Sequence, residues 1–146
     1  MIHEAGARHV PMVDVFCDGG SRGNPGPAAI GAVVFDPSVD PPVVLASVSA
    51  TIGVATNNVA EYRALIAGLE AALAFTPTTV RVRADSELLI RQLEGRYRVK
   101  NAGLQPLHRE ASALLARFEE FELQHVRREF NTDADALVNA ALDAAG

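Results

Sequence analysis

The sequence predicts an α/β domain on a five-stranded mixed sheet, in which three antiparallel strands precede two parallel strands and helices cover both faces. Two observations lead to this prediction. Apolar residues recur with a period of two in three early segments and change to a helical period after residue 57. Beyond that change, short strand-like segments alternate with amphipathic segments, which is typical of a sheet flanked by helices.

The first half of the chain is predicted to form three strands joined by short connections. Residues 13–17 form the first strand and run into Asp18-Gly19-Gly20, which indicates a turn. A Gly/Pro-rich loop at 21–27 leads to the second strand at 29–35, and a proline-rich connection leads to the third at 43–52. Connections this short favour an antiparallel meander.

The second half begins with an amphipathic helix over residues 58–75. Its apolar face is formed by Tyr62, Leu65, Ile66, Leu69 and Leu73. The remaining pattern predicts, in order, a strand at 79–84, helices at 86–93 and 104–118, a strand at 121–127 and a helix at 132–144. Strands and helices in this order indicate one mixed sheet between helical layers.

Length and composition set limits on the class of protein. With 146 residues, 49% of them hydrophobic, the chain has enough apolar side chains for one folded domain, predicted at 11–146 after a flexible tail at 1–10. No apolar run is long enough to span a bilayer, and a single cysteine, Cys17, excludes an internal disulfide and suits a cytoplasmic location. A net charge of −5 argues against a protein that coats nucleic acid through bulk electrostatics. It does not exclude a protein that binds the phosphate backbone locally.

Four acidic residues at predicted element ends are the candidate catalytic and metal-binding groups: Asp18, Glu61, Asp85 and Asp135. Each also has a structural explanation. Asp18 suits a turn, Glu61 completes a capping box with Asn58, Asp85 suits a helix cap, and Asp135 suits the first turn of a helix.

Taken together, these four positions predict one site. Asp18 and Asp85 follow two strands that are expected to be neighbours, and open α/β sheets bind ligands outside the carboxyl ends of their strands. Clustered carboxylates repel one another unless a cation lies among them, and oxygen ligands without a thiolate suit Mg²⁺ or Mn²⁺. Two such ions hydrolyse phosphodiester bonds in many nucleases, so we predict a metal-dependent nuclease.

The loop at 21–27 and several amides surround this predicted site. The loop lacks the GK[ST] signature of a phosphate-binding P-loop, but its glycines allow close approach of a sugar–phosphate backbone. Four asparagines lie near the predicted crevice: Asn24, Asn57, Asn58 and Asn131. They serve either as turn and cap residues or as hydrogen-bond partners of the 2′-hydroxyl groups and base edges of RNA.

The ordered motifs DGGSRGNPGP at 18–27, TNNVAE at 56–61, ADS at 84–86 and NTDADAL at 131–137 resemble the type 1 ribonuclease H family. The likeness runs from about Met12 to Leu142. It implies the ribonuclease H-like fold and cleavage of the RNA strand of an RNA–DNA hybrid, with two Mg²⁺ ions (Mn²⁺ as an alternative) and products carrying 5′-phosphate and 3′-hydroxyl ends. The family's catalytic and metal-binding carboxylates correspond to Asp18, Glu61, Asp85 and Asp135.

The resemblance also implies contacts with the RNA strand from Gly19, Asn24 and Asn57, and from the position of Glu87, where many members have an amide. To these we add Gly20, Asn58, Arg128 and Asn131 as predicted substrate-binding residues. Many relatives carry a histidine in a loop before the last helix. His125 lies in a predicted strand, so Arg128 is the better candidate for a charged group near the scissile phosphate.

One departure concerns the grip on the DNA strand. Many bacterial relatives insert a basic helix-loop, whereas residues 94–101 here lead directly to the next helix, as in compact archaeal and actinobacterial members. Arg96, Arg98 and Lys100 provide either a reduced substitute or an ordinary solvated surface, so we expect weak, salt-sensitive binding.

Alternative functions are a nuclease of this fold acting on double-stranded RNA or DNA, and a non-catalytic hybrid-binding module. A monomer is expected.

Related actinobacterial chains sometimes fuse this domain to a phosphatase, and the sequence leaves open whether this chain is part of a larger protein.

Overall fold

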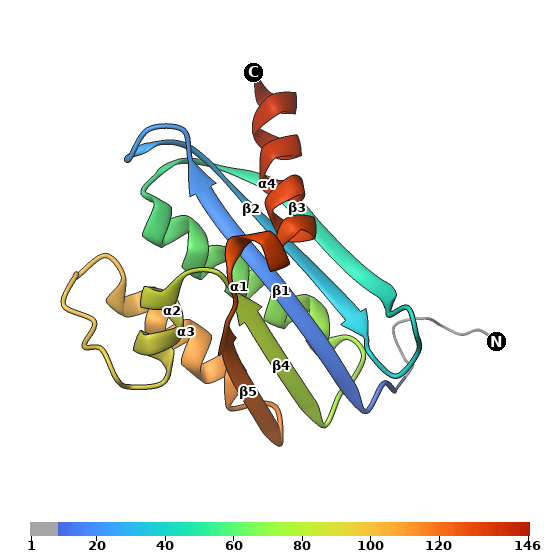
Figure 1. Cartoon of the computed structure of the whole chain (residues 1–146). Coiled ribbons are helices and arrows are strands. Elements are labelled where there is room, and N and C mark those ends of the chain that lie inside the picture. Colours follow the sequence, from blue (N-terminus) through green and yellow to red (C-terminus); the bar gives the residue numbers. More distant parts are fainter. Residues whose placement is uncertain (1–8) are drawn as a thin grey trace.

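The computed structural model describes residues 9–146, which form a five-stranded sheet in the order β3-β2-β1-β4-β5 (Figure 1). The strands are β1 (Met12–Ser21), β2 (Gly26–Asp36), β3 (Val43–Ala55), β4 (Thr79–Ala84) and β5 (Glu120–His125). The helices are α1 (Asn57–Leu73), α2 (Glu87–Leu93), α3 (Gln105–Leu115) and α4 (Thr132–Ala145), with a 3₁₀ turn, η2, at Arg128–Phe130. Strands β1 to β3 are antiparallel, and β4 runs parallel to β1 and β5, which confirms the predicted topology.

The predicted turn after residue 17 is wrong. Strand β1 continues to Ser21, because Asp18 and Gly19 pair with Gly31 and Ile30 of β2. The loop predicted at 21–27 therefore shortens to a tight turn at 22–25. Asp18 lies within a strand instead of at its end, one residue beyond the last pair between β1 and β4, Cys17 with Ala84.

The hydrophobic core lies between one face of the sheet and helices α1, α2 and α3. Alternate β1 residues Val13, Val15 and Cys17 are buried there against the α1 residues Leu65 and Leu69. On the opposite face, α4 covers a smaller apolar cluster formed by Ala29, Val138 and Leu142 (Figure 1). Helices therefore cover both faces, as predicted, and no helix within residues 9–146 has the length and apolar character needed to cross a membrane.

The N-terminal boundary differs from the prediction of a flexible tail at 1–10. Residues 1–8 of that prediction lie outside the described residues. Val10, in contrast, is 3% exposed, and its N–H donates to the Phe75 carbonyl oxygen at 3.0 Å. The His9 ring nitrogen Nδ1 lies 2.8 Å from the Thr76 carbonyl oxygen. The packed domain therefore includes His9 and Val10.

The connection between α2 and α3 is compact. Residues 95–104 contain turns and no helix, so the chain has no helical insertion at this point. The predicted helix at 104–118 is shorter than expected and ends at Leu115, with Phe118 buried in the turn that follows. The predicted last strand ends at His125, and η2 occupies the loop before α4.

Candidate active site

The four predicted acidic side chains line one cavity of about 550 Å³ at the end of the sheet where β4 stops. Each comes from a different element. Asp18 lies on β1, Glu61 in the second turn of α1, Asp85 directly after β4 and Asp135 in the first turn of α4. Segments far apart in the sequence therefore bring four carboxylates to one concave surface.

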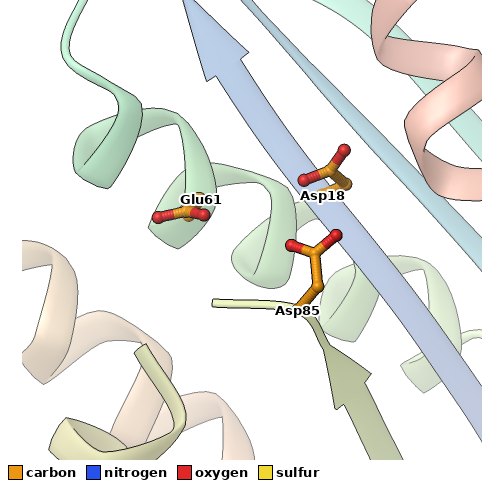
Figure 2. A group of neighbouring side chains, drawn as sticks. All are labelled: Asp18, Glu61 and Asp85. Atoms are coloured by element: carbon orange, nitrogen blue, oxygen red, sulfur yellow. The ribbon is translucent and has the colours of Figure 1, made fainter. Parts of the chain in front are cut away.

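Three of these carboxylates lie especially close together. Oxygen atoms of Asp18, Glu61 and Asp85 all lie within 4.8 Å of one another, and Figure 2 shows the three side chains around a common space. Among residues 9–146, no arginine, lysine or histidine forms an ion pair with any of the three. Asp135 lies 3.4 Å from an Arg128 nitrogen and accepts a 3.4 Å hydrogen bond from Asn139 Nδ2. A hard divalent cation suits an all-oxygen donor set of this kind.

The electrostatic cost of this arrangement appears in the carboxyl pKa values. Burial is the largest of several effects that together raise the pKa of Asp18 to about 8; the others are the charge of Asp85, a hydrogen bond to Asp135, and the charges of Asp135 and Glu61. The pKa of Glu61 is raised to about 7, mainly by burial and in part by the charge of Asp85, against an opposing hydrogen bond from Ser86. Without a bound cation, the site therefore holds protons instead of its full negative charge.

Two glycines allow the helices to approach the strand that carries Asp18. A Cβ atom on Gly19 would lie 2.2 Å from the Ala60 carbonyl oxygen, so only glycine lets β1 contact α1 next to Glu61. A Cβ atom on Gly31, which pairs with Asp18 across β1 and β2, would lie 2.3 Å from the Ala134 carbonyl oxygen of α4. Gly19 was predicted as a substrate contact; the structure adds a packing role and reveals Gly31 as its counterpart.

The structure also removes two of the competing structural explanations. The N-cap of α1 is Thr56, whose hydroxyl accepts from the Val59 N–H, so the capping box predicted for Asn58 and Glu61 is absent. The N-cap of α2 is Ser86, whose hydroxyl accepts from the Leu89 N–H. Glu61 and Asp85 are therefore not needed as caps, and both carboxylates point into the cavity region.

Asn131 is placed differently from the prediction of a substrate contact. Its side chain is only 1% exposed, and its Nδ2 donates to the Cys17 carbonyl oxygen at 2.9 Å. Its Oδ1 is buried without a hydrogen-bond partner among the described residues. Asn131 therefore joins the start of α4 to β1 next to Asp18, and its burial leaves no surface for a direct contact with substrate.

The other predicted amides surround the turn between β1 and β2. Asn57 Oδ1 accepts hydrogen bonds from the Ser21 N–H at 2.8 Å and the Ser21 hydroxyl at 3.1 Å. Asn24 Oδ1 accepts from the Asn57 N–H at 3.1 Å, outside the cavity lining. Gly19, Gly20, Asn57 and Asn58 all line the cavity. The Asn57 Nδ2 group has no hydrogen-bond partner within residues 9–146 and stays available as a donor.

Three predicted residues remain: Arg128, Glu87 and His125. Arg128 lines the cavity with its side chain 79% exposed, whereas Glu87 lies outside the lining and pairs with Arg91 on α2 at 3.5 Å. His125 lies in β5, as predicted.

Cavity residues that were not predicted individually are Ser21, Arg22, Val138, Asn139 and Leu142, of which Ser21 and Arg22 belong to the loop predicted beside the site. The spacing of Asn139, four residues after Asp135 on one helix, was a usable signal for its contact with that carboxylate. Arg22 carries no such signal, because its partner, Asp143 at 2.6 Å, lies at the far end of the chain.

Comparisons with known proteins agree with this geometry. A model of the reverse transcriptase-like family matches residues 16–141. The N-terminal ribonuclease H domain of Rv2228c from Mycobacterium tuberculosis is 48% identical and has a TM-score of 0.86, covering 90% of this chain and 99% of that chain. Ribonuclease H1 of Halobacterium salinarum is 44% identical, with a TM-score of 0.86 and coverage of 91% and 98%.

A third solved structure, LC11 ribonuclease H1 in complex with an RNA/DNA hybrid, is 40% identical with a TM-score of 0.83 and covers 91% of this chain and 98% of that chain. Some relatives are longer. The chain spans 36% of the length of the bifunctional protein Rv2228c and 64% of the Halobacterium salinarum ribonuclease HI sequence. The chain therefore belongs to the reverse transcriptase-like family, and it has the fold of the compact type 1 ribonucleases H.

Proposed function

We propose that this protein is an endonuclease that hydrolyses the RNA strand of RNA–DNA hybrids with the help of divalent metal ions. The observation that supports this most strongly is the group of three carboxylates within 4.8 Å of one another and without a cationic partner in the described chain. The relative LC11 ribonuclease H1, which binds an RNA/DNA hybrid, shares 40% of its sequence with this chain and covers 91% of it.

The carboxylates would hold two Mg²⁺ ions, with Mn²⁺ as an alternative. Asp18 would contribute to both ions, because its carboxylate lies within 4.8 Å of Glu61 and Asp85 and also has a hydrogen bond to Asp135. Glu61 and Asp85 would hold one ion, and Asp135 would complete the other. When bound, such ions lower the pKa of an attacking water molecule and stabilise the departing oxygen of a phosphodiester. Cleavage would leave 5′-phosphate and 3′-hydroxyl ends.

The chain's own residues would position the RNA strand. Gly19 and Gly20 line the cavity without side chains, and Asn57 offers its Nδ2 group as a donor to a 2′-hydroxyl, which DNA lacks. Its side-chain oxygen is held by Ser21, so the orientation of this amide is set before substrate binds. Arg128, exposed beside Asp135, would place a positive charge near the scissile phosphate.

The DNA strand would contact the loop between α2 and α3. Arg96, Tyr97, Arg98 and Arg109 line a separate hollow of about 500 Å³ next to this loop. Three guanidinium groups beside an exposed tyrosine suit a phosphate backbone. Few charges contribute, so the electrostatic part of this binding should be weak already at moderate salt.

A cleavage assay on three matched duplexes tests this function. Labelled RNA–DNA hybrid, double-stranded RNA and double-stranded DNA of one sequence are incubated with Mg²⁺ and with chelator, using Asp18→Asn as the inactive control. Mg²⁺-dependent cleavage of the RNA strand of the hybrid alone is expected. Cleavage of double-stranded RNA would indicate a nuclease with relaxed selectivity. Hybrid binding without cleavage would show a non-catalytic binding module and would overturn the proposal.

A further inference from the structure

The two edge strands of the sheet differ in how they are protected against pairing. Strand β5 is short, 6 residues, and carries Glu120, Glu122 and His125. Strand β3 has 13 residues, reads VVLASVSATIGVA, and contains no charged residue and no proline. Charges, prolines, short length and β-bulges are the usual features that keep an exposed edge from pairing with another strand. Strand β3 lacks the first three, and its two register irregularities with β2 lie outside residues 46–51.

The outer side of β3 is free along the described part of the chain. Its pairing partner is β2, and no backbone group of residues 9–146 outside that pair hydrogen-bonds to it. Figure 1 shows β3 at the margin of the sheet, with the helices lying over the sheet faces. The register with β2 is interrupted at Leu45 and Ile52, which have no direct β2 partner. Between these two irregularities, residues 46–51 form a regular stretch of strand.

We propose that β3 is a self-association surface, which pairs antiparallel with β3 of a second copy of this chain. A two-fold axis near the middle of the strand, at Val48 or Ser49, would join the two sheets into one. This arrangement is isologous, so the unpaired N–H groups of each edge meet carbonyl oxygens of the other, and each contact occurs twice. It would replace the monomer expected from the sequence once the protein concentration is high enough.

The side chains at the two ends of β3 favour a second copy as the occupant. Antiparallel pairing brings the start of one strand beside the end of the other. Val43 and Val44 at the start are 48% and 55% exposed, and Val54 at the end is 75% exposed. Apolar side chains that face water in one copy would thus cover each other in the pair.

Charge supports the same choice. The chain has a net charge of −5, which opposes association through most of its surface. An uncharged strand adds no like-charge contacts near the two-fold axis, where the same short segment of both copies meets. No β3 residue lines the carboxylate cavity, so both active sites would stay open in the dimer.

Sedimentation velocity of the full chain between about 1 µM and about 500 µM tests the proposal, because this range covers weak to moderate association. We expect the mass to rise from 15.5 kDa toward twice that value. Ser47→Lys, at an exposed side chain in the regular stretch, should raise the dissociation constant at least about tenfold through like-charge contact. Ala113→Lys adds the same charge on the exposed side of α3 and should leave dimerisation unchanged.

Hydrogen exchange provides a second measurement that is independent of the variants. Amide protection in residues 43–55 should increase with protein concentration, while protection in β5 stays constant. A monomer at every concentration would overturn the proposal, as would equal dimerisation of Ser47→Lys and Ala113→Lys. Strong protection of β3 already present at the lowest concentration would also overturn it, because the edge would then be covered within a single chain.

Discussion

Asp14 and Asp18 lie four residues apart on β1 and point to the same face of the sheet, yet their surroundings are opposite. Asp14 is 6% exposed and is held by two arginines: Arg81 at 2.6 Å and 2.9 Å, and Arg83 at 2.9 Å. Asp18 has no arginine partner in the described chain and instead lies within 4.8 Å of Glu61 and Asp85. One strand therefore carries one neutralised carboxylate and one that lacks a counter-charge.

The neighbouring strand accounts for this difference. Strand β4 runs beside β1 and places Arg81 next to Asp14 and Arg83 next to Phe16. It stops at Ala84, opposite Cys17, and the next residue is Asp85. An aspartate before that point meets arginines, whereas an aspartate after it meets carboxylates. The fold thus neutralises a structural carboxylate internally and leaves the counter-charge of the other to an external cation.

The largest effect should follow from replacing the aspartate without a counter-charge. Asp18→Asn removes a metal-binding oxygen and should reduce Mg²⁺-dependent hybrid cleavage by at least about a thousandfold. The variant should stay folded, because it also relieves repulsion with Glu61 and Asp85. Cleavage rates and circular dichroism check this. Full activity of Asp18→Asn would show that the two aspartates do not differ in function.

The second effect concerns the contact that holds Asp18 beside α1. Gly19→Ala would force a Cβ atom to within 2.2 Å of the Ala60 carbonyl oxygen, so strand and helix must separate. We expect the free energy of unfolding to fall by about 2–3 kcal/mol, together with a loss of cleavage. Gly20→Ala is the matched control, because its Cβ would meet nothing closer than 3.8 Å. Equal denaturation midpoints for the two variants would contradict this packing role.

The third prediction is a loss of stability with activity kept, the opposite of the result expected for Asp18→Asn. Asp14→Asn should lower the free energy of unfolding by about 2 kcal/mol, since it leaves Arg81 and Arg83 partly buried without a carboxylate. Cleavage by the folded variant should be near normal, because Asp14 lies outside the cavity lining. Urea denaturation and cleavage rates at low temperature separate the two properties. If Asp14→Asn lost activity while keeping its stability, the division of roles along β1 would be wrong.

The smallest effect is a pH dependence of the metal-free protein. The pKa of Asp18 is raised from 3.8 to about 8 and that of Glu61 from 4.5 to about 7. At these two groups the folded state therefore binds protons more tightly than the unfolded chain, so the stability that they contribute is full below pH 4 and is lost as the pH rises to about 8. With allowance for solvent screening, we expect a loss of about 1–2 kcal/mol.

Thermal unfolding in chelator at a series of pH values measures this loss. Asp18→Asn should flatten the profile, whereas Asp14→Asn should keep its shape. Saturating Mg²⁺ should restore stability near pH 8, because a ligand that binds only the folded state stabilises it. A metal-free profile that rises between pH 5 and pH 8 would contradict the proposed repulsion.

Much of the architecture and the identity of the four carboxylates follow from local features of the sequence. Apolar periodicity identified every strand and the four main helices, with errors confined to their ends. The motifs around Asp18, Glu61, Asp85 and Asp135 indicated one site because they were predicted to lie at strand and helix ends. These signals are readable because each depends on residues close together in the chain.

Only the tertiary structure decided which residues support the site and which face solvent. Asn131 resembled a substrate contact but is buried against the Cys17 carbonyl, and Gly31 showed its role only when α4 was seen against β2. The pairing of Asp14 with two arginines and the exposed edge of β3 likewise depend on strand order and register. Contacts of this kind join residues far apart in the chain, and their formation depends on how whole elements pack, which no local pattern encodes.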